Sequence, residues 1–529
     1  MSIRRYRRSI VVFLFPWLLA GTAARGEDLS EIRFPTSCAP QVEGEFLHGL
    51  ALLHSFEYPD SKRVFAALVE QHPECAMGYW GAAMSLWHPL WAPPSAEDLE
   101  RGAALLRRTA TLEQSPREAA YLGALAGFYS SSDVTTHRER AVEYERRMER
   151  LAREHLDDPE ATLFYALSLL ATADPHDKSY AHQYHAAALL DWVRTSHPRH
   201  PGVLHYLIHA YDFPGLAHLG LDAAMVYAEA APDSAHAQHM PSHIFTRLGL
   251  WERSIASNRD STHSAQEFTR RAHLAGQYDE GLHSIDYLMY ALLQTARDDE
   301  ASALLGELSH IGRAEPENFK VAYTLAASPA RFALERRQWR EASDLPLLRP
   351  TDFPWQQFGW ARSIHHFARG LGAARSAQLD RARIELAEIR RLEETLPPTT
   401  LPYWREEVQV EGDIVASWVA QVEGRTAEAL RLAAEAADRE DAVDKHPVTP
   451  GEVLPARELY AELLLEAGRA EESLAQYRSV LANSPNRLNA LLGAAHAARA
   501  AGQATLAASY LEAAGRQTAS GNATRGETW

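Results

Sequence analysis

The sequence predicts an all-α protein built as an array of helical repeats. Alanine and leucine are abundant and runs of β-branched residues are rare, a composition that favours helices over strands. A chain of 529 residues would ordinarily make about three or four domains, whereas a repeat array reaches this length without a single core. A spacing of 34 residues recurs along the chain, so we expect a helical solenoid.

The 34-residue spacing is clearest near the carboxyl end. A small residue is followed five positions later by another small residue, four later by a large apolar one and eight later by a proline. This pattern begins at Gly468, Ser473, Tyr477 and Pro485, and Gly502, Ala507 and Leu511 repeat it 34 residues on. Small residues let two antiparallel helices, A and B, pack closely, and proline ends helix B.

This pattern resembles the tetratricopeptide repeat (TPR) superfamily, and copies of it spread over most of residues 42–515. The resemblance implies a TPR superhelix, an α-solenoid of about 10–12 helix-turn-helix repeats, in which helix A lines a concave groove. The stretch around "HPGVLHYLIHAYD" also resembles uncharacterised exported bacterial TPR proteins over roughly residues 40–300. That second resemblance implies no established activity.

Residues 1–26 read as a secretory signal peptide. Four arginines precede the apolar run 10–21, and small residues follow up to a cleavage site near Ala24-Arg25-Gly26. The apolar run is short for a bilayer span, and an uncleaved anchor is the alternative. We therefore expect an exported protein, periplasmic or secreted, with no transmembrane segment after the signal is removed.

The remaining chain divides by its histidine content. Residues 27–41 form an amino-terminal extension, 42–315 are histidine-rich repeats, 316–515 are plainer repeats, and 516–529 look like a disordered tail. The net charge of −17 argues against nucleic-acid binding. The two cysteines, Cys38 and Cys75, are either a disulfide of an exported chain or two unrelated buried thiols.

Histidines are concentrated in residues 197–243, which hold 8 of the 25 in the chain. We number one repeat from Pro201, a first-turn proline, and register the next by Gly249 at position 15. Both repeats then carry histidine at positions 5 and 9. The pairs are His205 with His209 and His239 with His243. Residues four apart share a helix face, and neighbouring helices pack closely, so four imidazoles should project from one patch of the groove.

The TPR resemblance implies that positions 2, 5, 9, 12 and 13 of each repeat face the groove, and further polar residues fall there in this numbering. They are His236 and His283 at position 2, Asp286 at position 5, Tyr290 at position 9, Asp212 at position 12, and His54 and His88 at position 13, with Trp80 and Trp87 nearby. His54 and His88 would face the patch from about half a superhelical turn away. By contrast, His182, His185, His197 and His200 lack register partners, so we expect surface or loop positions for them.

Paired histidines at helical spacing favour a transition-metal site. So many ligands suit two ions, or one ion with orienting neighbours, and a nitrogen-rich exported site favours copper or zinc. The expected ligands are His205, His209, His239, His243, His54, His88, His283 and Asp286; the expected orienting or groove residues are Asp212, His236, Tyr290, Trp80 and Trp87. The competing interpretation is duplication of structural residues with the repeat, and the tryptophans are typical of repeat packing.

Two functions follow from this sequence. The first is a metalloprotein, either a metal-dependent enzyme (oxidase or hydrolase) or a metal carrier. The second is a non-enzymatic TPR scaffold whose groove binds an extended peptide or a partner protein. The sequence contains no nucleophile elbow, phosphate loop, dinucleotide fingerprint or His-Glu-x-x-His motif, which excludes many enzyme classes without naming one.

Overall fold

The computed structural model describes residues 29–232, 234–523 and 525. The predicted signal peptide, residues 1–26, lies outside this described part. The described residues form α-helices joined by short connectors, and their one sheet pairs two-residue strands, β1 (Gln277–Tyr278) and β2 (Ala314–Glu315), in parallel. The prediction of an all-α fold is therefore confirmed.

The first half of the chain contributes thirteen α-helices to the described part. They are α1 (Glu43–His54), α2 (Tyr58–Gln71), α3 (Ala76–Met84), α4 (Ala96–Arg108), α5 (Pro116–Phe128), α6 (His137–Glu154), α7 (Pro159–Thr172), α8 (Ala181–Arg194), α9 (Pro201–Tyr211), α10 (Leu221–Ala230), α11 (Ala235–His239), α12 (Pro241–Arg247) and α13 (Trp251–Arg271).

The second half contributes twelve more. They are α14 (Asp279–Gln294), α15 (Asp298–Ser309), α16 (Phe319–Glu335), α17 (Trp339–Ser343), α18 (Gly359–Arg375), α19 (Leu379–Thr395), α20 (Pro402–Val422), α21 (Thr426–Ala442), α22 (Ala456–Glu466), α23 (Ala470–Asn483), α24 (Leu488–Ala500) and α25 (Ala504–Gln517). Short 3-10 turns lie between some of them.

The helices stack as a TPR-type solenoid. Each helix packs on the next one along the chain, and the A helices α14, α16, α18, α20, α22 and α24 also pack on one another in that order. Small residues permit this packing. A Cβ at Gly493 of α24 would lie 2.2 Å from the ring of Tyr477 in α23, and one at Gly81 would lie 2.3 Å from the ring of Phe65. The large apolar residue of the repeat pattern, Tyr477 or Phe65, thus packs directly against a glycine of the following helix.

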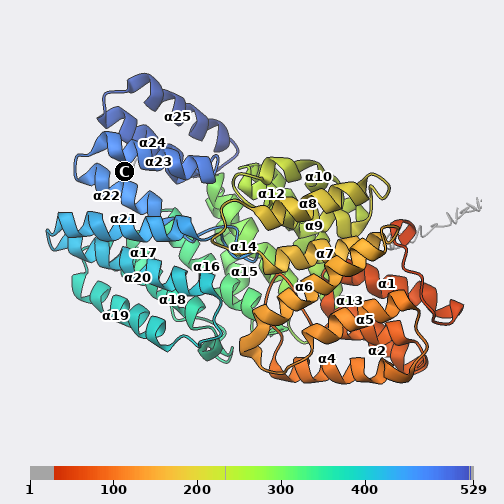
Figure 1. Cartoon of the computed structure of the whole chain (residues 1–529). Helices are drawn as coiled ribbons and strands as arrows, with labels where there is room; N and C mark the ends of the chain where they lie inside the picture. Colours follow the sequence, from red (N-terminus) through yellow and green to blue (C-terminus); the bar gives the residue numbers. More distant parts are fainter. Residues whose placement is uncertain (1–28, 233, 524, 526–529) are drawn as a thin grey trace, which may run out of the picture.

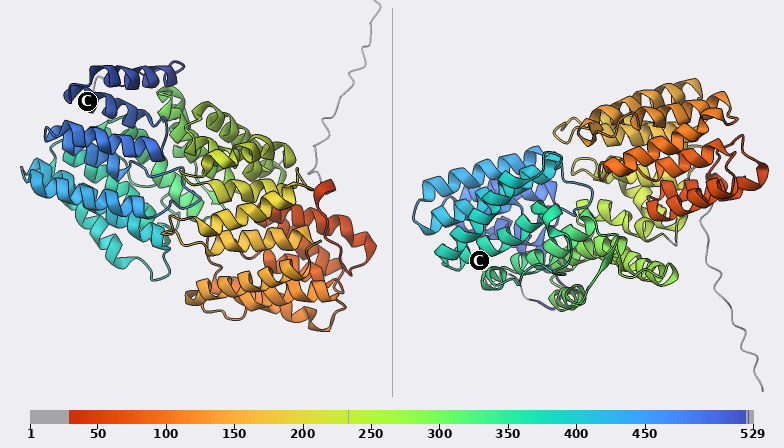
Figure 2. Two further views of the ribbon diagram at one scale, coloured as in Figure 1. Left: turned by 45° about the horizontal axis from the view of Figure 1, so that its top comes forward. Right: turned by 90° about the horizontal axis from the view of Figure 1, so that it is seen from below.

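The solenoid has two arms (Figure 1). Helices α1–α13 form one arm and α17–α25 the other, with α14–α16 between them, and Figure 2 shows the same arrangement from two other sides. The amino-terminal extension belongs to the first arm, because Phe34 packs against Trp80 and Tyr121. A disulfide joins Cys38 of this extension to Cys75, the residue before α3.

The connector between α21 and α22, residues 443–455, crosses from the second arm to the first. Its Lys445 Nζ lies 2.8 Å from Asp212 Oδ2 at the end of α9. His446 Nε2 donates to the carbonyl oxygen of Trp91 (3.0 Å), and Tyr287 of α14 donates to the carbonyl oxygen of Thr449 (2.9 Å). The connector is therefore packed into the inner side of the first arm.

The carboxyl end folds back on the middle of the chain. The backbone N–H groups of Asn522 and Ala523 both donate to the carbonyl oxygen of Ala296, at 3.0 and 3.1 Å. Arg525 pairs with Asp298 at the start of α15. Residues 516–523, assigned by sequence composition to a disordered tail, are thus folded, because backbone acceptors at the end of α14 hold them. In the described part of the chain, no helix is both long and apolar enough to cross a membrane.

Candidate metal centre

Helix α9 begins where the repeat numbering predicts. Pro201 occupies its first turn, and the side chain of His200 caps it, since Nδ1 accepts the N–H of Gly202 at 3.1 Å. All eleven residues of the helix are buried, so His205 and His209 lie one turn apart inside the protein. His200 itself is fully buried, which corrects the surface position expected from the sequence.

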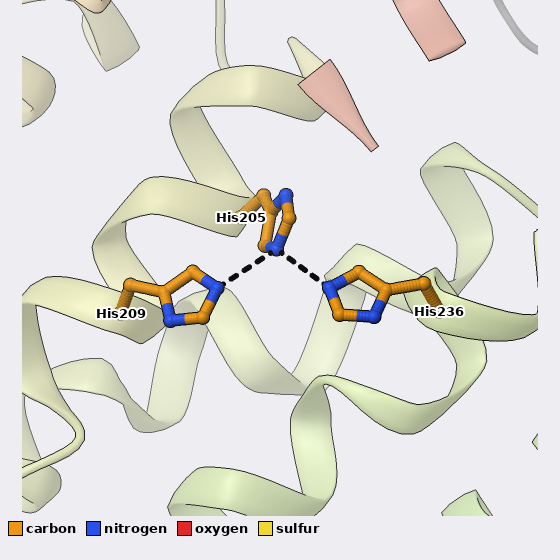
Figure 3. Close-up of side chains that lie close together, drawn as sticks. All are labelled: His205, His209 and His236. Atoms are coloured by element: carbon orange, nitrogen blue, oxygen red, sulfur yellow. Dashed lines mark hydrogen bonds between the residues drawn. The ribbon is translucent and has the colours of Figure 1, made fainter. Parts of the chain in front are cut away.

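The first histidine cluster consists of His205, His209 and His236. The Nε2 atom of His205 lies 3.1 Å from Nε2 of His209 and 3.2 Å from Nε2 of His236. Figure 3 shows the three rings turned toward one point, two from α9 and one from α11. The sequence placed His236 among the orienting residues, whereas the structure places it beside the predicted pair.

The second histidine cluster consists of His239, His243 and His283. Nε2 of His239 lies 3.0 Å from Nε2 of His243, and the His283 ring centroid lies 4.2 Å from that of His239. The predicted single helix is divided into α11 and α12 at Pro241, which has no N–H to donate. Met240 nevertheless keeps helical angles (φ −53°, ψ −38°), so the two rings remain on one face.

The two clusters are neighbours and are built from the same repeat positions. Ring centroids are 5.9 Å apart between His209 and His243, and 6.3 Å apart between His236 and His239. Each cluster takes repeat positions 5 and 9 of one helix A and position 2 of the next. Neighbouring repeats therefore share the construction of each cluster, and a single helix supplies residues to both.

In the first cluster, two of the three rings have an outward nitrogen that is hydrogen-bonded to an acceptor. His205 Nδ1 lies 2.6 Å from the carbonyl oxygen of His54, and His236 Nδ1 lies 3.1 Å from Glu280 Oε2. A backbone carbonyl accepts and cannot donate, so His205 carries its proton on Nδ1; the carboxylate assigns the same tautomer to His236. The Nε2 lone pairs of both rings are thus left pointing inward.

In the second cluster, the same assignment follows from different acceptors. His239 Nδ1 lies 2.7 Å from Asn258 Oδ1, and Asn258 Nδ2 donates to the carbonyl oxygen of Ser254 (2.8 Å), which fixes the orientation of the amide. His243 Nδ1 lies 2.8 Å from Asp212 Oδ2. Both rings donate outward through Nδ1 and present a bare Nε2 inward, as metal-binding histidines do.

The electrostatics keep four of the six rings neutral. Burial, together with the neighbouring rings, lowers the pKa of His205, His209, His239 and His283 well below the ordinary histidine value. In the pairs His205–His236 and His239–His243 both rings carry the proton on Nδ1, so a hydrogen bond between their Nε2 atoms would require a cationic ring, which burial disfavours. The Nε2 separations of 3.0–3.2 Å are instead close to the roughly 3.0–3.4 Å between ligands that each lie about 2.1 Å from one ion.

The carboxylates that orient the rings are themselves held by cations. Asp212 faces Lys445 Nζ at 2.8 Å and Arg247 Nε at 3.0 Å, and Glu280 is paired with Lys320. Burial would raise the pKa of Asp212, but Lys445, Arg247 and His243 outweigh it and hold that pKa well below the ordinary value. The sequence placed Asp212 among the orienting or groove residues; in the structure its carboxylate orients His243, on the adjacent repeat.

The predicted ligand His54 lies outside both clusters, because its ring has other partners. His54 Nε2 lies 2.8 Å from Glu160 Oε2, and its Nδ1 lies 2.9 Å from the hydroxyl of Tyr206. His200 Nε2 lies 3.0 Å from Glu160 Oε1, and its Nδ1 already accepts a backbone N–H, so it donates to Glu160. Hydrogen bonds satisfy this group without a metal, and its role is to hold the carbonyl oxygen that orients His205.

The predicted ligand His88 also lies apart. Helix α3 ends at Met84, so His88 sits in the turn after it and not on a helical groove face. Its ring stacks on Tyr58 with centroids 4.0 Å apart, beside Trp91. Burial is the main cause that lowers the pKa of His88 to about 3. The repeat numbering placed His88 on a helix A that is longer than α3.

The remaining predicted residues serve the fold. Asp286 lies 3.8 Å from Arg331 Nε and does not reach the second cluster, and burial raises its pKa to about 6. Tyr290 accepts a hydrogen bond from Arg487 Nη1 (3.1 Å). Trp80 packs edge-on against an aromatic ring and Trp87 stacks on Phe128 with centroids 3.8 Å apart, as repeat packing requires.

Asp212 apart, the sequence did not indicate the side chains that orient the rings or hold their acceptors. Asn258, Glu280 and Lys320 come from helices α13, α14 and α16, and none of them stands at the positions that the repeat numbering singles out. Glu280 lies three residues before His283, which would have been a usable signal once the cluster was known. Asn258 has no such signal, because its amide reaches His239 only through packing of α13 on α11.

Comparisons with known proteins add a fold-level likeness. No protein-family model and no curated protein matches this sequence. Among solved structures, a monomeric mutant of IFIT1 with Gppp-AAAA is 13% identical with a TM-score of 0.38, covering 91% of this chain and 96% of that one. The human IFIT1 dimer with m7Gppp-AAAA is likewise 13% identical with a TM-score of 0.38, covering 88% and 95%. Similarity at this level transfers no ligand, and the absence of nucleic-acid binding stays a prediction.

Proposed function

We propose that the two histidine clusters each bind one transition-metal ion and that the chain is a metal-dependent enzyme. The observation that supports this most strongly is the inward convergence of Nε2 atoms whose rings donate outward through Nδ1. Four of the six rings have such an outward acceptor: His205, His236, His239 and His243. Orientation of this kind raises the basicity of a ligand and fixes its geometry.

The ligand set favours copper or zinc. Both clusters offer imidazole nitrogens, and the carboxylates Asp212 and Glu280 face the outer nitrogens instead of the centre. Imidazole suits copper and zinc, whereas magnesium, calcium and manganese prefer oxygen ligands. The proposed export of the chain, which rests on its amino-terminal sequence, places it where a copper site is reasonable.

An enzyme fits the geometry better than a carrier. Three protein ligands leave one position of a four-coordinate ion open for water or substrate, which is the arrangement of catalytic sites. Adjacent ions can also act together on one substrate. Zinc would supply an activated water for hydrolysis, and copper would supply redox chemistry for oxidation. The rigid orientation of the rings by buried acceptors favours retention of an ion over its release.

The metal content of the purified protein tests this proposal. We expect about two copper or zinc ions per chain after reconstitution, measured by elemental analysis. His205→Ala and His239→Ala should each lose about one ion, and the double variant should lose both. His263→Ala is the matched control, because the His263 side chain is 69% exposed and lies on α13 away from both clusters. A full complement of metal in the double variant, or none in the wild type, would contradict the proposal.

The scaffold function has weaker support. The inner side of the first arm, where a peptide would bind in a scaffold, is contacted by the chain's own residues 443–455, including Lys445 and Thr449. A peptide would have to displace this connector and the Lys445–Asp212 pair. Peptide capture that is indifferent to a chelator, and that a histidine-cluster variant retains, would favour the scaffold.

A further inference from the structure

A cavity of about 840 Å³ lies between the two arms and reaches the first histidine cluster. The first arm lines it with residues 89–94, 134–141 and 170–175, and the second arm with 398–403 and 444–447. Of the six clustered histidines, His209 lines this cavity. The volume lies within the range of about 300–1,000 Å³ that is typical of small-molecule sites.

The cavity has an exposed mouth and a buried end. Arg138, Pro398 and Thr399 are exposed, whereas His209 and His446 are buried. Most of the wall is apolar, and seven of its residues are prolines: Pro89, Pro93, Pro94, Pro175, Pro398, Pro402 and Pro447. Proline is rigid and brings no N–H, so the wall presents a preformed apolar surface that leads from solvent to the metal ligand.

Charged groups at the buried end are already paired. Lys445 Nζ lies 2.8 Å from Asp212 Oδ2, and Asp444 Oδ1 lies 2.7 Å from Lys178 Nζ. The His446 ring donates to the carbonyl oxygen of Trp91 (3.0 Å). Any ion that entered this apolar end would lose its hydration, and an anion would also have to break one of these pairs, so the lining selects a neutral molecule.

We propose that this cavity binds a neutral, predominantly apolar organic substrate, one donor atom of which takes the open position on the ion held by His205, His209 and His236. This inference rests on the proposed metal function and adds the substrate class and the route of access. The apolar wall would bury the body of the substrate, and the paired charges would exclude ionic competitors. The ion of the first cluster is then the one that contacts the substrate, because His209 of that cluster lines the cavity.

Two neutral ligands that differ in an apolar ring test this proposal. Protein reconstituted with copper or cobalt is titrated with imidazole and with 4-phenylimidazole, and binding is followed by the visible spectrum of the metal. We expect 4-phenylimidazole to bind at least ten-fold more tightly, because its phenyl ring enters the cavity. Metal content is measured on the same samples, so a failure of metal binding is seen separately from a failure of ligand selection.

Variants of the wall provide the decisive comparison. Ala171→Trp fills the cavity from the end of α7, and Thr399→Trp narrows it at the exposed mouth. Each should remove the preference for 4-phenylimidazole while leaving metal content and imidazole binding unchanged. Ala188→Trp, on the exposed side of α8, is the matched control. Equal affinity for the two ligands in the metal-bound wild type, or a preference that survives in both wall variants, would overturn the inference; absence of metal would overturn it with the proposed function.

Discussion

Replacement of Asn258 by leucine should weaken metal binding at the second cluster and leave metal binding at the first cluster unchanged. Asn258 Oδ1 accepts the proton of His239 Nδ1 at 2.7 Å, and its Nδ2 donates to the carbonyl oxygen of Ser254 at 2.8 Å, with the side chain fully buried. Leucine keeps a similar volume and removes the acceptor. The tautomer and orientation of His239 would no longer be fixed, and a buried N–H would lose its partner.

The magnitude follows from these two losses. Removal of an orienting partner typically lowers metal affinity by about 10–100-fold, which corresponds to roughly 1.4–2.8 kcal/mol. The unsatisfied N–H should lower the free energy of unfolding of the apo protein by about 1–3 kcal/mol. The first cluster does not contact Asn258, so the affinity of its ion should change less than about two-fold.

A two-site competition titration against a chromophoric chelator measures both affinities in one experiment. Thr262→Ala is the matched control, because Thr262 lies one turn further along α13 and its hydroxyl donates to the backbone carbonyl of Asn258, not to a ring. Circular dichroism establishes that each variant is folded. If folded Asn258→Leu protein retained both affinities within two-fold, or lost both equally, the assignment of Asn258 as the partner that orients His239 would be refuted.

Three further predictions concern stability. Gly202→Ala should lower the free energy of unfolding by about 1–3 kcal/mol in chemical denaturation, because its Cβ would lie 2.5 Å from Nδ1 of His54; unchanged stability would contradict this close approach. The double variant Cys38→Ser, Cys75→Ser should lower the free energy of unfolding by about 2–4 kcal/mol, since the disulfide closes a loop of 37 residues. Reduction of the wild-type protein should lower it by the same amount, and a reduced wild type as stable as the oxidised one would contradict this. Glu411→Gln should stabilise the protein at pH 8 and have little effect at pH 4, measured as melting temperatures across pH. Burial raises the pKa of Glu411 to about 8, so the folded state keeps a proton that the unfolded state releases above the ordinary pKa of 4.5. The wild type therefore loses up to roughly 5 kcal/mol of its free energy of unfolding as the pH rises between these two values. A difference in melting temperature between variant and wild type that does not grow with pH would contradict this.

Four of the clustered histidines could be predicted because their positions depend on local periodicity. His205 and His209, like His239 and His243, stand four apart on one helix, and a 34-residue offset relates the pairs. The same numbering placed His236 and His283 at position 2, but it did not show that position 2 of one repeat completes the pair of the preceding one. That fact depends on how neighbouring A helices pack, which the structure shows.

The predictions that failed depended on contacts between distant segments. The structure places His54 outside both histidine clusters, because Glu160 and Tyr206, more than a hundred residues away, bind its ring. The place of the connector 443–455 could not be predicted, since its prolines and polar residues do not reveal that Lys445 pairs with Asp212. Repeat periodicity carries information about neighbours along the solenoid and none about segments that return from its far end.

The connector gives the second arm a role at the candidate metal centre. Lys445 and Arg247 neutralise Asp212, so the carboxylate that orients His243 depends on a segment more than 200 residues further along the chain. The plain repeats, which lack clustered histidines, thus hold a buried cation next to the second cluster and complete the cavity beside the first.

Anomalous diffraction from metal-reconstituted crystals tests the central claim most directly. Data collected at the copper and zinc absorption edges should show two peaks, one about 2.0–2.1 Å from ring nitrogens of His205, His209 and His236, and the other at a similar distance from those of His239, His243 and His283. Crystals with no peak at either cluster after reconstitution, or with a peak only at the hydrogen-bonded group around Glu160, would contradict the account.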